Sequence, residues 1–410
     1  MNNFNELLKK YADIAINIGV NIQKDQILYI NAPIESNEFV RALSRSAYDA
    51  GARDVMVNWN DDELALIRFL NAPDKAFKEF PQWKADGLAE LAKDNAAFIS
   101  ITGNDPDIFK DVDPEKMATD TKTKLKALQE YRKYTMASKV AWCVIAAPSK
   151  AWAKKVIGID DSEKAIEKLW DKIFKIVRVD REEPVEAWKE HTTNLENRVK
   201  YLNKENFKKL HFKSSITDLE VELPKGHIWA GGGEKNDKDT YFVANIPTEE
   251  VFTMPHRTGV NGVVKNTKPF NYNGNLIDDF TLTLENGKVV DFKAEKGYDV
   301  LKKMLETDEG ALHLGEVALV PHDSPISNLD TIFYNTLFDE NASCHLALGK
   351  AYPTCIENGS DMETEELTEK GANDSLIHED FMIGSADMNI IAEKQNGEKV
   401  QIFKDGNWSI

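Results

Sequence analysis

Cysteine is scarce in this 410-residue sequence, which has only Cys143, Cys344 and Cys355. The three residues form no Cys-x-x-Cys pair and are too few for a disulfide framework. We therefore expect them to be small, buried, apolar residues of a protein in a reducing compartment.

Long apolar runs are absent as well, so no stretch approaches the length of a membrane span. The first ten residues carry charges where a signal peptide would need an apolar core, which favours a cytoplasmic protein. Basic residues are in the minority, with 51 Lys and Arg against 69 Asp and Glu and a formal net charge of −18. This balance argues against nucleic acid or an anionic membrane as a partner, because both require basic patches.

Several catalytic and nucleotide-binding motifs are missing. No Gly-x-Gly-x-x-Gly follows a predicted strand, and no serine lies in a Gly-x-Ser-x-Gly elbow. The run Gly-Gly-Gly-Glu at 231–234 lacks the Gly-Lys-Ser/Thr ending of a phosphate loop, so we interpret it as a flexible turn.

The composition, 42% hydrophobic and 29% charged, is that of an ordinary soluble globular protein, and the length allows two or three domains. In the first half, helical patterns over 4–18 and from Ser36 to just before Gly51 alternate with short apolar strands, and Asp61-Asp62 caps a further helix. The expected strands are 26–30, 54–58, 97–101 and 140–145. This alternation predicts a parallel α/β sheet covered on both faces.

The pattern changes between about residues 183 and 210, where a helical connector is expected over 188–207. Beyond it the signals are mostly β. Asn286-Gly287 predicts a hairpin between 280–284 and 288–292, a strand is expected over 399–403, and helices over 298–305 and 328–337. The sequence therefore predicts an N-terminal α/β domain, 1–190, and a C-terminal α+β, mostly antiparallel β domain, 191–410.

Acidic residues and histidines recur in apolar, strand-like segments of the C-terminal third. The segments are 247–252 (Pro-Thr-Glu-Glu-Val-Phe), 315–320 (Gly-Glu-Val-Ala-Leu-Val), 344–348 (Cys-His-Leu-Ala-Leu) and 375–384 (Ser-Leu-Ile-His-Glu-Asp-Phe-Met-Ile-Gly). A carboxylate or imidazole in such a setting is costly to bury unless something pairs with it. Four such segments indicate a divalent metal site, with two metals sharing it.

Strand geometry restricts which of these residues cooperate. Alternate side chains share a face, so His378 and Asp380 project together and can bind the same metal ion. By the same rule Ile377, Phe381 and Ile383 project into the core. Each residue alone has an ordinary explanation: a lone histidine is more often a hydrogen-bonded core or surface residue, and a lone glutamate is more often paired with Arg or Lys. The prediction depends on their co-occurrence.

Sequence geometry does not decide the roles of two pairs of neighbouring residues. Glu249 and Glu250 point in opposite directions on a strand, so either is a candidate ligand. His256-Arg257 fits a substrate-carboxylate site or an ordinary surface pair.

The proposed ligands are carboxylates and imidazoles rather than thiolates. Structural zinc sites favour cysteine and are closed to water. An oxygen-rich set with two histidines suits a catalytic pair of Zn, Co or Mn ions, with a bridging carboxylate and open positions for water.

Together these blocks resemble the aminopeptidase T/aminopeptidase S family, which includes PepS and consists of two-metal exopeptidases. The similarity extends over essentially the whole chain. Its blocks are 103–107 (Gly-Asn-Asp-Pro-Asp), 111–116 (Asp-Val-Asp-Pro-Glu-Lys), 245–253, 260–263, 315–321, 345–352 and 373–385.

The resemblance assigns metal binding to the second glutamate of the Pro-Thr-Glu-Glu block, Glu250, and to four further residues, Glu316, His345, His378 and Asp380. It makes Tyr352 a catalytic site residue. It also implies an N-terminal α/β domain, a β-rich catalytic domain, and a homodimer whose active sites face an enclosed cavity.

The function that we expect is a cytoplasmic metalloaminopeptidase that releases N-terminal residues from short peptides with water activated by two divalent ions. Tyr352 would donate a hydrogen bond to the developing oxyanion or position a ligand, and Glu249 is a candidate general base. The alternatives are a two-metal hydrolase of another amide or of a phosphoester, and a binding protein whose metal is structural.

Overall fold

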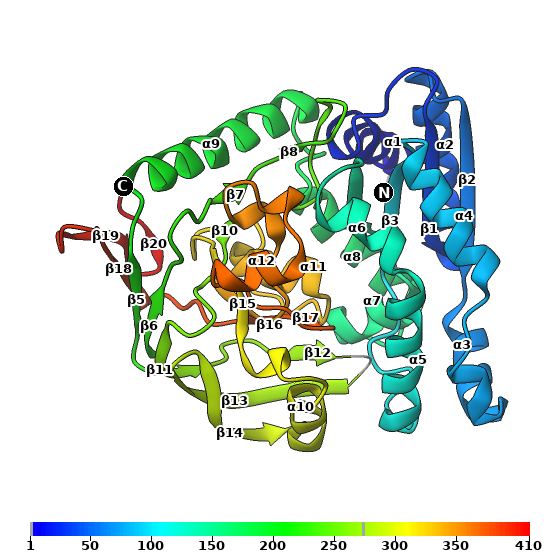
Figure 1. Ribbon diagram of the computed structural model, residues 1–410. Helices are drawn as coiled ribbons and strands as arrows, with labels where there is room; N and C mark the ends of the chain where they lie inside the picture. Colours follow the sequence, from blue (N-terminus) through cyan, green and yellow to red (C-terminus); the bar gives the residue numbers. More distant parts are fainter. Residues whose placement is uncertain (1–2, 273–274) are drawn as a thin grey trace. The chain divides into compact units, whose positions relative to one another are not determined.

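The computed structural model describes residues 3–272 and 275–410, which form two compact units (Figure 1). The first unit comprises the chain up to His191 together with Gly233–Pro247, and the second comprises Thr192–Gly232 and Thr248–Ile410. The sequence assigned 233–247 to the C-terminal domain. In the structure this segment folds with the first unit, where Asn245 forms a parallel bridge with Val144.

The first unit is built on a parallel sheet in the order β2-β1-β3-β4. Its strands are β1 (Ile27–Pro33), β2 (Asp54–Asn60), β3 (Ala97–Thr102) and β4 (Trp142–Ala146). A short antiparallel pair, β8 (Glu234–Lys235) and β9 (Tyr241–Phe242), also belongs to this unit. The parallel sheet predicted for the first half of the chain is confirmed.

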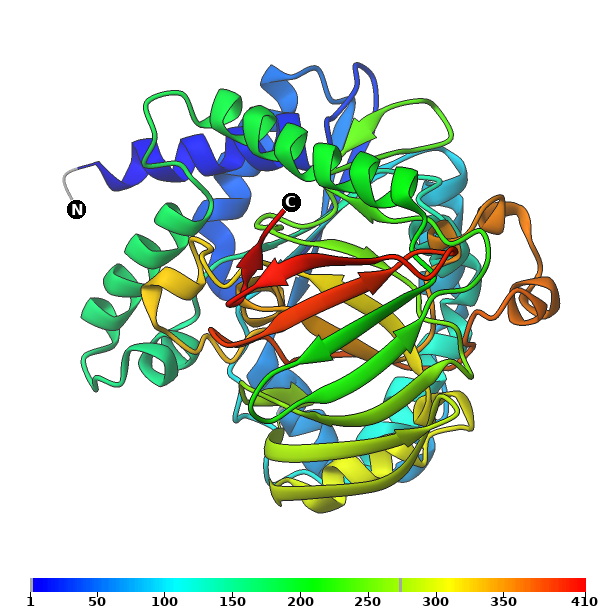
Figure 2. The same ribbon diagram turned by 90° about the vertical axis from the view of Figure 1, so that its left-hand side faces the viewer.

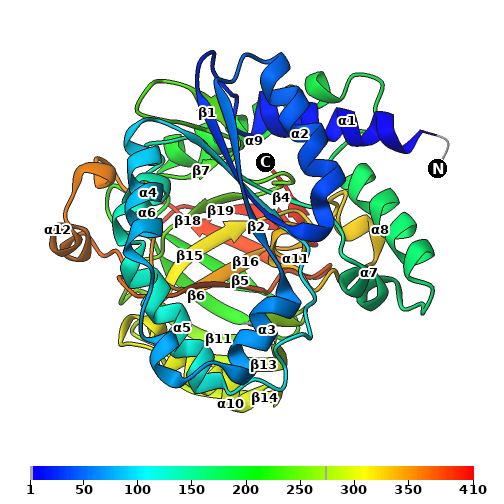
Figure 3. The same ribbon diagram turned by 90° about the vertical axis from the view of Figure 1, so that its right-hand side faces the viewer.

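Helices cover both faces of this sheet. The helices of this unit are α1 (Phe4–Ile14), α2 (Asn37–Asp49), α3 (Asp62–Asn71), α4 (Gln82–Lys93), α5 (Pro114–Ala127), α6 (Gln129–Met136), α7 (Lys150–Ile157) and α8 (Ser162–Ile176). Helices α4 and α6 pack on Tyr29, Phe98 and Trp142. Helices α1, α2 and α8 lie on the other side (Figure 3). There Tyr11 of α1 stacks on Phe39 of α2, which contacts Trp170 of α8.

The sequence pattern located three of these helices, α1, α2 and α3. The predicted helix over 4–18 is α1 followed by a π-helical turn, Ala15–Gly19. Asp61 caps α3, as predicted, because its carboxylate accepts a hydrogen bond from the amide of Leu64 at 3.0 Å. The connector is α9 (Pro184–Glu205), which begins four residues before the predicted position and crosses from the first unit into the second.

The second unit contains two antiparallel sheets. Figure 2 shows the larger one face on, in the order β12-β13-β11-β6-β5-β18-β19-β20, with β14 paired to β13. Its strands are β5 (Lys209–Lys213), β6 (Asp218–Glu222), β11 (Val260–Lys265), β12 (Phe270–Tyr272), β13 (Asn275–Glu285), β14 (Lys288–Lys296), β18 (Asn389–Glu393), β19 (Lys399–Lys404) and β20 (Asn407–Trp408). The predicted hairpin is confirmed, because Glu285 pairs with Lys288 and both turn residues, Asn286 and Gly287, have positive φ.

The smaller sheet has the order β17-β16-β15-β10-β7. Its strands are β7 (Ala230–Gly231), β10 (Val251–Thr253), β15 (Leu314–Leu319), β16 (His345–Gly349) and β17 (His378–Met382). The apolar core of the unit includes residues of both sheets; Phe280 of β13 lies 5.4 Å from Phe381 of β17, measured between ring centroids. The predicted fold class, an α/β part followed by a mostly antiparallel α+β part, is confirmed.

Three short helices complete this unit: α10 (Tyr298–Leu305), α11 (Thr336–Asp339) and α12 (Thr364–Glu369). Helix α10 was predicted, but the helix predicted over 328–337 is wrong. A 3-10 turn, Ser327–Leu329, ends at Asp330, and both Asp330 and Tyr334 have positive φ, which a right-handed helix excludes. None of the described helices is long and apolar enough to cross a membrane.

Candidate metal centre

One face of the smaller sheet carries the predicted site residues. Glu316, Ala347 and Asp380 are directly opposed across β15, β16 and β17, so their side chains share that face. His345 and His378 lie two positions from Ala347 and Asp380 and join the same face. The opposite face is apolar, and its side chains belong to the core of the unit: Val317, Leu319, Leu346, Leu348 and Phe381.

A bulge at the start of β15 sets this register. The pairing of β15 with β16 shifts between Leu314 and Glu316, at Gly315. A Cβ atom on Gly315 would lie 2.4 Å from the carbonyl oxygens of both Gly349 and Lys350. Glycine therefore allows the close backbone approach that brings Glu316 opposite Ala347.

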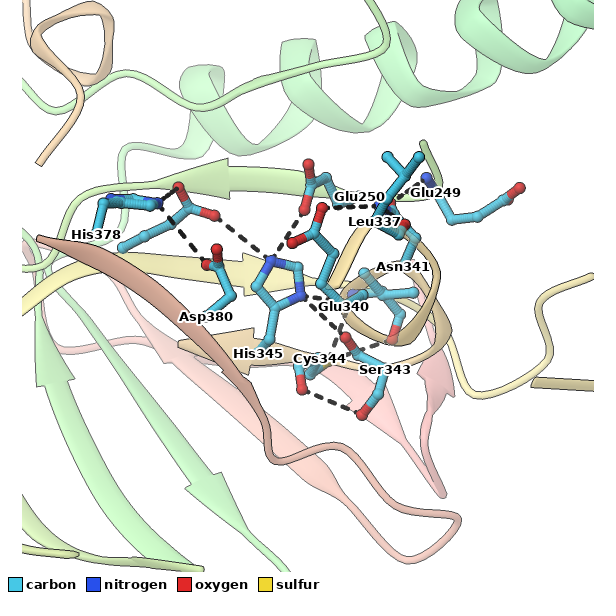
Figure 4. Close-up of polar contacts among 12 residues, drawn as sticks. Glu249, Glu250, Leu337, Glu340, Asn341, Ser343, Cys344, His345, His378 and Asp380 are labelled. Atoms are coloured by element: carbon cyan, nitrogen blue, oxygen red, sulfur yellow. Dashed lines mark hydrogen bonds and ion pairs between the residues drawn. The ribbon is translucent and has the colours of Figure 1, made fainter. Parts of the chain in front are cut away.

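His345 is fully buried and held in one orientation. Its Nδ1 lies 3.0 Å from the carbonyl oxygen of Glu340 and 3.1 Å from that of Ser343 (Figure 4). Because both partners only accept, Nδ1 carries a proton and donates it, and the lone pair of the neutral ring is on Nε2. That atom faces carboxylates, 3.0 Å from Oε2 of Glu250 and 3.5 Å from Oε1 of Glu316.

His378 has the same arrangement. Its Nδ1 donates to the carbonyl oxygen of Lys350 at 2.6 Å. Its Nε2 lies 3.6 Å from Oε2 of Glu316 and 3.8 Å from Oδ1 of Asp380. Each histidine is thus oriented by a backbone carbonyl and presents Nε2 to acidic oxygens, as metal-ligating histidines do.

The donor atoms fit divalent cations. Two neutral imidazole lone pairs that face carboxylate oxygens repel them unless a cation lies between. Among the described residues, Oε2 of Glu250 and Oδ1 of Asp380 are buried without a hydrogen-bond partner, because the 3.0 Å contact of Oε2 with His345 lacks hydrogen-bond geometry. The ligand atoms of Glu250, Glu316 and His345 lie within 4.8 Å of one another, and so do those of Glu316, His378 and Asp380. Mixed nitrogen and oxygen donors of this kind bind Zn, Co or Mn.

The negative charge of the buried carboxylates also shifts the pKa values of groups in the cluster. Burial raises the pKa of Glu316 to about 7, and the nearby carboxylate of Asp380 reinforces this shift against the opposing effect of the neighbouring histidines. Burial acts to lower the pKa of His345, but the carboxylates of Glu250 and Glu316 outweigh it, and the pKa lies well above the ordinary histidine value. Asp380 and Glu316 likewise raise the pKa of His378 against the effect of burial. All three shifts favour uptake of positive charge by the cluster.

Glu340 is a further acidic member of this cluster, which the sequence pattern did not indicate. Its carboxyl group is buried beside that of Glu250, and Oε1 accepts a hydrogen bond from Asn341 at 3.3 Å (Figure 4). Burial, with repulsion from Asp380 and Glu250, raises its pKa well above the ordinary glutamate value. The available signal was the acidic pair Asp339-Glu340, which follows the apolar residues Leu337 and Phe338 at the end of the wrongly predicted helix.

Glu249, the candidate general base, is not part of the cluster. Its side chain extends away from His345, on the opposite side from that of Glu250 (Figure 4). Its backbone amide donates to the side chain of Asn341 at 2.8 Å. The structure therefore gives Glu249 an anchoring contact through its backbone and does not bring its carboxylate to the two histidines.

Tyr352 lies at the edge of the cluster. Its ring meets the imidazole of His378 edge to face, with centroids 4.7 Å apart. Burial raises the pKa of its hydroxyl well above the ordinary tyrosine value, and the nearby Glu316 and Asp380 reinforce the shift. The phenol therefore keeps its proton and remains a hydrogen-bond donor beside the histidine.

His256 and Arg257 are outside the cluster. The guanidinium of Arg257 donates to Oδ1 of Asn373 at 3.0 Å and pairs with Glu309. The ring of His256 lies against Gly371, where a Cβ atom would approach it to 2.5 Å. Arg257 thus connects loops of the second unit, and its guanidinium is engaged by protein groups.

Comparison with known proteins shows that the whole chain is similar to metal-dependent peptidases. The family model described as "Thermophilic metalloprotease (M29)" matches residues 4–408. Aminopeptidase 2 of Geobacillus stearothermophilus is 53% identical over 409 residues, which cover 100% of this chain and 99% of the relative. Aminopeptidase AmpS of Bacillus subtilis is 50% identical, with 100% of both chains covered.

A solved structure shares the fold. It is described as wild-type AmpT from Thermus thermophilus and superposes with a TM-score of 0.93 at 37% sequence identity. The match covers 99% of this chain and 100% of that chain.

Proposed function

Because the chain belongs to the family of thermophilic metalloproteases M29, we propose that it is a metal-dependent aminopeptidase that releases N-terminal amino acids from short peptides. Two relatives that match it over their full or almost full length are named aminopeptidases, at 53% and 50% identity. The same family was expected from the sequence resemblance.

The proposed mechanism depends mainly on Glu316, whose two carboxylate oxygens face different histidines. Its Oε1 faces His345 and its Oε2 faces His378, so one carboxylate belongs to both donor groups. Two divalent ions of Zn, Co or Mn would be held by these two groups, which have Glu316 in common. The first group contains Glu250 and His345, and the second contains His378 and Asp380. Glu340, buried beside Glu250, is a further oxygen donor on the first side.

When bound, such ions lower the pKa of a water nucleophile and polarise the scissile carbonyl. The chain contributes orientation and hydrogen bonding. The carbonyl oxygens of Glu340 and Lys350 keep both imidazoles in the tautomer that presents Nε2. The hydroxyl of Tyr352 donates a hydrogen bond to the oxyanion that develops on the substrate.

The function is tested by comparing substrates that differ in one feature. We expect the metal-loaded protein to hydrolyse leucine p-nitroanilide, and to leave N-acetyl-leucine p-nitroanilide and p-nitrophenyl phosphate intact, because the free amine is part of what an aminopeptidase recognises. Release of p-nitrophenol or p-nitroaniline is followed by absorbance. Faster turnover of the phosphoester would instead favour a two-metal phosphoesterase, and turnover of none of them would favour a structural metal.

We also propose that the protein is a cytoplasmic homodimer, as the family resemblance implies. In the first unit, Leu64, Ile67 and Leu70 form a stripe along α3, and each is more than half exposed. Met56 and Trp59 are exposed on β2, an edge strand of the parallel sheet. Exposed apolar side chains grouped along one helix mark interaction surfaces, and a second copy can cover the stripe on α3 through a two-fold axis.

The dimer proposal is tested by placing charge in this stripe. We expect the wild type to sediment as a dimer at micromolar concentration and the double variant Leu64→Asp, Leu70→Asp to sediment as a folded monomer, because two carboxylates cannot be buried in an apolar interface. Val290→Asp is the control, since Val290 is also about half exposed but lies on β14 of the second unit. A monomeric wild type, or a dimeric double variant, would contradict the assignment.

A further inference from the structure

Phe252 adjoins the proposed metal centre but takes no part in the chemistry assigned above. It follows Glu250 by two positions into β10, so the two side chains leave the same face. Its ring meets that of Tyr352 edge to face, with centroids 5.9 Å apart. Tyr352 in turn contacts His378. A continuous chain of contacts therefore joins Phe252 to the donor groups.

The surroundings leave part of this ring uncovered. Phe252 is opposite Ala318 on one neighbouring strand and opposite Ala230 on the other, and neither alanine extends beyond Cβ. The ring is only partly buried and packs, with Tyr352 and Leu367, against a small apolar cluster: Met254, Ala351, Cys355, Ile356 and Ala372. Apolar surface beside buried charges is thus available to a ligand.

We propose that Phe252 forms the wall that receives the side chain of the substrate's N-terminal residue and sets the size and polarity accepted there, an inference that rests on the proposed aminopeptidase function. The free amine and the scissile carbonyl are attached to the same Cα, so the first side chain branches directly beside the atoms that the donor groups hold. On this face of β10, Glu250 is acidic and Met254 is buried, so the partly exposed ring of Phe252 is the apolar surface within reach.

This placement implies a preference. Leucine or phenylalanine at the N-terminus covers the ring and gains apolar contact, whereas alanine reaches little of it. An acidic N-terminal residue is repelled by the nearby carboxylates of Glu250 and Glu316.

The experiment measures kcat/KM for leucine and alanine p-nitroanilides in the wild type and in Phe252→Ala. We expect the leucine-to-alanine ratio to fall by about tenfold in the variant, since a lost apolar contact is worth that order of discrimination. Phe252→Leu should keep most of the wild-type ratio, and Phe252→Trp should shift preference toward alanine because the larger ring fills the space. Bound metal, measured by mass spectrometry, should be unchanged in all three.

Phe292→Ala is the matched control, because Phe292 is also a partly buried ring but lies on β14 of the larger sheet, where it packs on Tyr298 of α10. It should leave the ratio unchanged. An unaltered ratio in Phe252→Ala, in an active enzyme, overturns the inference and leaves the function intact. A wild type that hydrolyses neither substrate overturns the function itself. If Phe252→Ala fails to fold, the leucine-to-alanine ratio is compared between Phe252→Leu and Phe252→Trp. The same ratio in these two variants would overturn the inference.

Discussion

Replacing Glu316 with glutamine is expected to lower kcat/KM for peptide hydrolysis by roughly a thousandfold or more, because bound ions contribute several kcal/mol to such reactions and each 1.4 kcal/mol is about tenfold. Glu316 is the only residue shared by both donor groups found among the described residues. Glutamine keeps the size of the side chain but replaces one anionic oxygen with an NH₂ group, which cannot bind a cation. One substitution therefore damages both proposed ion sites.

The measurements are kcat/KM on leucine p-nitroanilide and metal content per chain. Glu285→Gln is the matched control, because Glu285 is exposed at the end of β13 and its loss removes the same charge from the same unit. We also expect metal-free Glu316→Gln to unfold at a temperature no lower than the metal-free wild type, since it relieves repulsion among buried acidic groups. Near-normal turnover with two bound ions would refute the role assigned to Glu316.

Removing divalent ions with a chelator is expected to abolish activity and lower the unfolding temperature, and adding Zn, Co or Mn should reverse both. The buried oxygens of Glu250 and Asp380 lack hydrogen-bond partners within the described structure, so ion binding satisfies groups that are otherwise unpaired. Ligands that bind only the folded state stabilise it, by about 2.7 kcal/mol at a free concentration one hundred times Kd.

Calorimetric titration of the metal-free protein should give two equivalents per chain, and differential scanning calorimetry the stability change. Calcium serves as the comparison ion, because it prefers oxygen ligands alone and gains little from His345 and His378. Activity that survives chelation would contradict a metal mechanism, and full activity at one equivalent would contradict the two-ion assignment.

The local pattern of apolar, polar and turn-forming residues predicted the larger part of the fold. The alternation around Glu316, His345 and Asp380 correctly indicated strands with one apolar and one functional face, because side-chain direction in a strand depends on position parity alone. The Asn286-Gly287 turn and the Asp61 cap were equally local signals and were confirmed.

Where the periodic pattern failed, hydrogen bonds from a side chain to the neighbouring backbone determined the conformation. The residues over 328–337 have helical spacing, but the buried carboxylate of Asp339 accepts hydrogen bonds from the amides of Phe333 and Asn335 and stabilises an irregular loop instead. The same loop brings Glu340 beside Glu250, which no periodicity predicts.

By itself, the sequence determined the family, the fold class and the side chains available for metal binding, because composition, alternation and local blocks are properties of neighbouring residues. Only the tertiary structure decided that Glu316 directs one oxygen to each histidine, that Glu340 is in the cluster and that the carboxylate of Glu249 is turned away. These features depend on the pairing of strands distant in sequence, on the bulge at Gly315 and on the backbone carbonyls that orient each imidazole.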